Sequence, residues 1–150
     1  MNTPQPGNTV PFAVTFDRQG NVLVAETGAK GLASFELKDD GILAQLDLVE
    51  TEQAATCWVA PAGGFFYTSN AGSASLTGFS SSQKGQLTRL GNTHTDPGTV
   101  DASATDHYLY VQAGKEGKVD EFALGEHGAL KSLGSVTVPN AAGGEGIVAG

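Results

Sequence analysis

Three carboxylates are the residues in this sequence best suited to chemistry: Asp96, Asp101 and Glu145. If the fold brings their side chains together near one axis, they can hold a cation or work as an acid and a base. The alternative is structural. Asp96 then belongs to a turn formed with Pro97 and Gly98, and Asp101 is a solvated channel residue.

Two polar residues are further candidates for ligand contact, Asn70 and Thr56. For Asn70 the alternative is a structural one, the capping of a turn by its side chain. Cys57 has no histidine near it in sequence, so a packed thiol is favoured over a nucleophile. No calcium-loop or zinc-protease motif is present, and the glycine-rich stretches precede no helix. No metal and no cofactor are therefore expected.

An internal repeat organises these residues. Turn glycines recur at spacings of 44 and 43 residues: Gly41, Gly85 and Gly128. The aromatic residue before each turn has the same spacings: Phe35, Phe79 and Phe122. A third series, in the second strand of each unit, is spaced by 43 each time: Leu23, Phe66 and Leu109. Three landmarks with one period indicate three copies of one unit.

Each unit predicts four short antiparallel strands. In the first unit these are residues 12–16, 22–26, 32–37 and 43–49, separated by turns rich in Asp, Asn and Gly. No segment has a helical period. Four strands in about 40–45 residues are typical of a β-propeller blade. The sequence therefore predicts an all-β propeller, and a β-sandwich is the second choice because it needs no such repetition.

The predicted organisation is one domain with an incomplete ring. Residues 1–10 lead in, and the blades cover 11–54, 55–98 and 99–142. Residues 143–150 match the first strand of a further blade. Propellers close with about 4–8 blades, so the chain needs partners. These are either the missing blades of a longer protein or further copies of itself.

One stretch resembles a blade opening of the seven-bladed lactonase-type propellers: Pro11-Phe12-Ala13-Val14-Thr15-Phe16-Asp17-Arg18-Gln19-Gly20-Asn21-Val22-Leu23-Val24-Ala25. Phe66-Tyr67-Thr68-Ser69-Asn70 and Gly85-Gln86-Leu87 match the second strand and the fourth-strand opening of that family. The family includes phosphogluconolactonase-like and carboxymuconate-lactonising proteins. The resemblance implies a small-molecule ligand and an enzyme that hydrolyses or forms a lactone of a small sugar acid or carboxylate.

The resemblance also implies Arg and His just after the blade-opening position, facing the central channel. The corresponding pairs here contain neither: Phe12 and Ala13, Thr56 and Cys57, Val100 and Asp101, Glu145 and Gly146. The histidines fall elsewhere: His94, His107 and His127. No catalytic residue is carried over, and whether the chain is enzymatic stays open. The alternative is a non-catalytic propeller that binds a protein or a small ligand.

Charge and hydropathy exclude some partners. The formal net charge of −8 repels phosphate backbones, so nucleic acid is not an expected partner. No apolar run is long enough for a membrane helix, and no signal peptide is visible. We expect a soluble protein, either cytoplasmic or exported as part of a longer chain.

Overall fold

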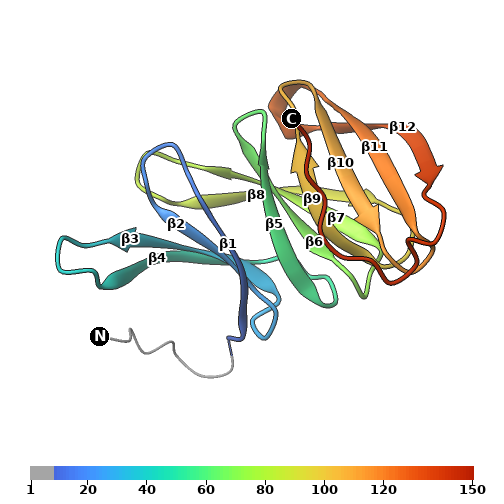
Figure 1. Ribbon diagram of the computed structural model, residues 1–150. Helices are drawn as coiled ribbons and strands as arrows, with labels where there is room; N and C mark the ends of the chain where they lie inside the picture. Colours follow the sequence, from blue (N-terminus) through green and yellow to red (C-terminus); the bar gives the residue numbers. More distant parts are fainter. Residues whose placement is uncertain (1–8) are drawn as a thin grey trace.

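The computed structural model describes residues 9–150, and within them twelve strands form three antiparallel sheets, here called blades (Figure 1). Blade 1 contains β1 (Pro11–Phe16), β2 (Val22–Glu26), β3 (Gly31–Leu37) and β4 (Leu43–Glu50). Blade 2 contains β5 (Thr56–Ala62), β6 (Phe65–Asn70), β7 (Ser75–Ser81) and β8 (Leu87–His94). Blade 3 contains β9 (Thr99–Ala104), β10 (Tyr108–Ala113), β11 (Lys118–Leu124) and β12 (Leu130–Thr137).

The predicted fold class is confirmed: three four-stranded antiparallel blades in an incomplete ring. Each blade keeps its strands in chain order, so every strand pairs with its neighbour in sequence. The only helical segment among the described residues is a short 3₁₀ turn, Glu126–Gly128, between β11 and β12.

One detail of the predicted repeat is wrong. In the structure Val22, and not Leu23, corresponds to Phe66 and Leu109. Val22 pairs with Phe35, just as Phe66 pairs with Phe79 and Leu109 with Phe122. A shift of one residue turns a side chain to the other face of the sheet. Leu23 therefore faces blade 2, where it packs with Phe66.

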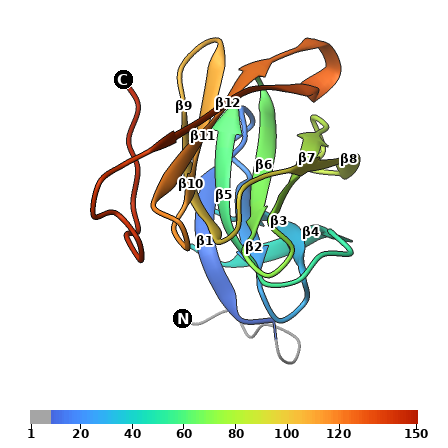
Figure 2. The same cartoon turned by 90° about the vertical axis from the view of Figure 1, so that its right-hand side faces the viewer.

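The innermost strands set the geometry of the ring. β1 lies beside β5, and β5 lies beside β9 (Figure 2). The end of the chain continues this series next to β9. The amide of Ile147 donates to Asp101 Oδ2 at 3.2 Å, and the amide of Ala149 donates to Ser103 Oγ at 3.0 Å. The segment predicted as the start of a further blade thus lies where a fourth inner strand belongs.

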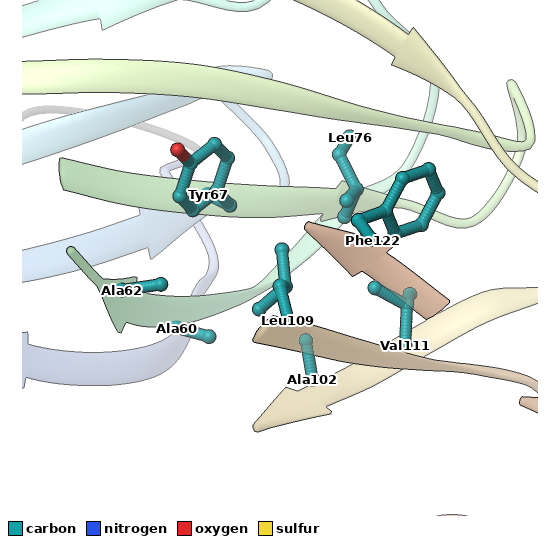
Figure 3. Packing of buried hydrophobic residues seen from close by; sticks show 8 residues of the cluster. All are labelled: Ala60, Ala62, Tyr67, Leu76, Ala102, Leu109, Val111 and Phe122. Atoms are coloured by element: carbon teal, nitrogen blue, oxygen red, sulfur yellow. The ribbon is translucent and has the colours of Figure 1, made fainter. Parts of the chain in front are cut away.

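Two apolar clusters join neighbouring blades. Between blades 2 and 3, side chains of β5, β6 and β7 pack against side chains of β9, β10 and β11 (Figure 3). Within this cluster Tyr67 is 1% exposed, and its hydroxyl donates to the carbonyl of Gly128 at 3.0 Å. Between blades 1 and 2, Leu23 and Leu32 meet Phe66 and Phe79. Each interface excludes water from side chains that no single blade buries alone.

Blade 1 has an apolar face on the side away from blade 2, and the part of it on β1 is exposed. A third cluster on this face, which includes Val22, Val24 and Phe35, draws its buried residues from blade 1 alone. Cross-strand partners share a face of a sheet. Val14 and Phe16 pair with Val24 and Val22 and therefore lie on this same face, where each is 58% exposed. Contiguous exposed apolar side chains of this kind mark a candidate interaction surface.

The equivalent turn glycines allow a matched prediction. Gly41 and Gly128 have nearly the same backbone, with φ of +80° and +78°. A Cβ at Gly41 would meet nothing within 4 Å, whereas one at Gly128 would lie 2.7 Å from Leu90 Cδ1 and 2.9 Å from Phe65 Cδ1. We expect Gly41→Ala to cost about 1 kcal/mol and Gly128→Ala about 2–4 kcal/mol of unfolding free energy. Urea unfolding measures both, and equal costs would contradict the packing around Gly128.

Candidate functional site

The inner strands have two distinct ends. The loop end is where β1, β5 and β9 begin, and the hairpin end is where they turn into β2, β6 and β10 (Figure 1). The sequence-predicted residues come from the connections between blades and from strand ends at the loop end. Loops held by a rigid scaffold are the usual place for function.

Asp101 and Glu145 lie on adjacent inner segments at the loop end. Asp101 is on β9, where its Oδ1 accepts the amide of Ala102 at 2.8 Å and its Oδ2 accepts the amide of Ile147. Glu145 is exposed and stands two residues before Ile147. The carboxylate of Asp101 therefore ties the last segment of the chain to β9, with Glu145 near this bond. A cleft of about 340 Å³ lies beside Glu145, and Gly98 and Lys115 are among the residues that line it.

Asp96 has different neighbours. Its Oδ2 lies 3.1 Å from Lys118 Nζ, and its amide donates to Asp120 Oδ2 at 2.8 Å. The hydrogen bond from Lys118 is the main cause that holds the pKa of Asp96 below its usual value. Burial instead raises the pKa of Asp120. Both partners belong to β11, so Asp96 joins the end of blade 2 to the outer half of blade 3. Among residues 9–150, no hydrogen bond or ion pair links Asp96 to Asp101 or Glu145.

Thr56 and Asn70 belong to a buried hydrogen-bond network, and both are 0% exposed. Thr56 Oγ1 donates to Asn70 Oδ1 at 2.9 Å. Asn70 Nδ2 donates to Thr77 Oγ1 at 2.9 Å and to Ser75 Oγ at 3.2 Å. Thr51 Oγ1 shares a further 2.9 Å hydrogen bond with Thr56 Oγ1. The network ties the loop that enters blade 2 to β6 and β7.

Cys57 lies at the start of β5 and is 8% exposed. Its Sγ donates to the carbonyl of Ala55 at 3.1 Å, and Thr27 Oγ1 donates to the carbonyl of Thr56 at 2.7 Å. Burial raises the pKa of the Cys57 thiol, a hydrogen bond from Thr27 lowers it, and the charge of Glu145 raises it again. The thiol is thus held in its protonated, weakly nucleophilic form, as the packed thiol predicted from the sequence should be.

The protonation of Cys57 gives a test. We expect iodoacetamide at pH 8 to alkylate Cys57 at least about tenfold more slowly in the folded protein than in urea, because the thiolate is the reacting form. Glu145→Gln should speed the reaction in the folded protein and leave the rate in urea unchanged. Equal rates in the folded and unfolded states would contradict the burial of this thiol.

Sequence reasoning missed Thr27, whose hydroxyl bonds from blade 1 to the backbone of blade 2. Its signal is weak, because threonines are common in strands and turns. Within residues 9–150 no group of three or more His, Cys, Asp and Glu residues is placed to hold a metal ion. In the same part of the chain, no helix has the length and hydropathy needed to cross a membrane.

Three four-stranded antiparallel sheets with their first strands side by side define an arc of a β-propeller. The model of one propeller family, described as lactonase, 7-bladed beta-propeller, matches residues 16–143. The chain belongs to this lactonase family, as its blade motifs had indicated.

Solved structures share the fold at low sequence identity. A Lactobacillus plantarum protein superposes with a TM-score of 0.80 at 16% identity, over 91% of this chain and 44% of its own. A protein of unknown function from Desulfotomaculum acetoxidans gives 0.76 at 16% identity, over 93% and 46%. The periplasmic gluconolactonase of Pseudomonas aeruginosa gives 0.72 at 18% identity, over 87% and 43%.

The chain therefore spans less than half the length of these solved structures. No protein with a curated description matches it.

Proposed function

We propose that these blades form part of a closed propeller that hydrolyses or forms the lactone ring of a small sugar acid or carboxylate. Membership of the lactonase family is the observation that carries the proposal. The similarity to a gluconolactonase supports the same class of substrate. The adjoining blades come from the rest of a longer chain or from further copies, and one of them covers the apolar face that carries Val14 and Phe16.

Asp101 and Glu145 are this chain's proposed contribution to the site. In hydrolysis, water adds to the lactone carbonyl, a base takes its proton, and the ring C–O bond breaks as the leaving oxygen is protonated. Asp101 is the proposed base, because backbone amides fix the orientation of its carboxylate. The inner-strand starts of these blades supply no Arg or His, so the cationic groups that hold an acidic substrate come from the adjoining blades.

The test is turnover of a lactone panel that includes gluconolactone, by the chain in its closed assembly. Asp101→Asn should lower kcat/KM by at least about tenfold, while Asp106→Asn, an exposed aspartate at the hairpin end, should leave it unchanged. No turnover by the closed assembly would overturn the proposal.

A second candidate function is a non-catalytic binding propeller. The observation that favours it is the absence of Arg and His from the inner-strand starts: the first two residues of β5 are Thr56 and Cys57, and both are buried. A fold of this kind serves many functions, so the site must decide between the two. Saturable binding of a lactone or its acid, without turnover and with wild-type affinity in Asp101→Asn, would favour this second candidate.

A further inference from the structure

A cavity lies at the hairpin end, away from Asp101 and Glu145. It measures about 780 Å³ and is formed where the β1–β2, β5–β6 and β9–β10 hairpins meet. This volume lies within the usual range of small-molecule sites, about 300–1,000 Å³. Its walls include Pro61, Phe65, Phe66 and Tyr108. Tyr108 is 42% exposed, so part of the aromatic wall is open to a ligand.

A cation and a glycine turn come together on one side of this cavity. The Arg18 guanidinium has no hydrogen bond and no ion pair with any residue in the range 9–150. Its Nη2 lies 3.0 Å from the place where a Cβ of residue 64 would stand. Glycine at position 64, with φ of +86°, leaves this space to the guanidinium. The geometry thus holds an unpaired positive charge against the β5–β6 turn.

The same turn offers backbone donors. Gly63 and Gly64 both have positive φ, and within the described chain neither amide donates to a carbonyl or a side chain. Free backbone N–H groups and guanidinium groups both bind anions in proteins. On the opposite wall the His107 and Tyr108 rings meet edge to face, with centroids 6.4 Å apart. Asp106, the acidic residue of the lining, comes from this opposite hairpin.

We propose that this cavity binds a small organic carboxylate with an apolar body. The carboxylate sits between Arg18 and the amide of Gly64, and the apolar part lies against Tyr108 and Phe65. A guanidinium binds the two oxygens of a carboxylate through two parallel hydrogen bonds, which gives direction as well as affinity. The aromatic walls select against a bare inorganic anion, because such an anion gains nothing from apolar contact. This site is separate from the proposed lactone chemistry at the loop end.

Titration of the closed assembly with benzoate tests the proposal, monitored by the amide resonances of Gly63 and Gly64 and by calorimetry. We expect saturable shifts of these two amides. Arg18→Gln should weaken binding by at least about tenfold, the usual scale for losing a charged hydrogen-bond partner. Lys84→Gln, which removes an exposed cation from another turn, should leave the affinity unchanged. Benzamide, the neutral analogue, and inorganic phosphate should each bind more weakly than benzoate.

Three results would overturn the proposal. The first is benzoate binding that is unaffected by Arg18→Gln. The second is benzamide or phosphate binding as tightly as benzoate. The third is no shift at Gly63 and Gly64 when benzoate saturates the protein. The unfolding curves of Arg18→Gln and Lys84→Gln should match that of the wild type. A loss of affinity then cannot be caused by unfolding of the variant.

Discussion

Phe79→Ala should cost the closed assembly about 3–5 kcal/mol of unfolding free energy, the usual price of deleting a buried phenyl ring. Phe79 is 0% exposed and packs with Leu23 and Leu32 across the interface of blades 1 and 2. The cavity left behind cannot collapse easily, because both sheets are held by their own hydrogen-bond ladders. The substitution therefore weakens the packing between blades 1 and 2 as well as the packing within blade 2.

The matched control is Phe12→Ala. Phe12 is also an aromatic residue near the blade 1–blade 2 junction, where its ring meets Trp58 edge to face at 4.8 Å, but it is 54% exposed. Phe12→Ala should lower the unfolding free energy by no more than about 1 kcal/mol. Urea unfolding at one fixed protein concentration gives both values, since the stability of an assembly depends on concentration. Similar losses for the two variants would contradict the described interface.

Asn70→Asp should be the most destabilising polar change, at about 3–5 kcal/mol near neutral pH. It places a carboxylate at a position that is 0% exposed, and it removes the two N–H donors that now serve Ser75 and Thr77. Burial raises the pKa of the new carboxyl above its unfolded value. Its neutral form is therefore favoured in the folded state, and the penalty grows as pH rises above the unfolded pKa.

Asn92→Asp is the control for this change. Asn92 is exposed, and its Oδ1 accepts from Thr77 Oγ1 at 2.7 Å, a bond that aspartate can also accept. Its effect should stay within about 0.5 kcal/mol at any pH. Urea midpoints at pH 7 and pH 4 test the pair. A cost for Asn70→Asp that is the same at both pH values would contradict the burial of this position.

The strands were predictable because their signals are local. Alternation, turn glycines and the 43–44-residue period placed β2 at residues 22–26, as observed. The register of blade 1 was missed by one residue because Leu23 and Val22 are both apolar, and only the partner strand distinguishes their faces. Val22 is the residue opposite Phe35. The aromatic series was the better landmark, since Phe35, Phe79 and Phe122 are all buried.

The surroundings of the site were less predictable because they depend on distant partners. Asp96 pairs with Lys118, which is far along the chain on another blade. Thr56 and Asn70 carry polar groups that suit a ligand, yet their partners on neighbouring strands enclose them completely. Arg18 stands against Gly64 because two hairpins meet at the hairpin end, and no periodicity in the sequence shows that contact.

Two measurements on the purified chain test most directly whether these blades are an arc that must be completed. Light scattering gives the molecular mass in solution, and an apolar dye reports exposed apolar surface. The exposed Val14 and Phe16 on blade 1 and the exposed Leu133 and Val136 on β12 predict that the chain alone does not persist as a well-packed monomer. We expect either a discrete assembly of copies or a monomer that binds the dye and lacks a cooperative unfolding transition. A monomer of 15.3 kDa that unfolds cooperatively and binds no dye would contradict the claim that these blades need to be completed.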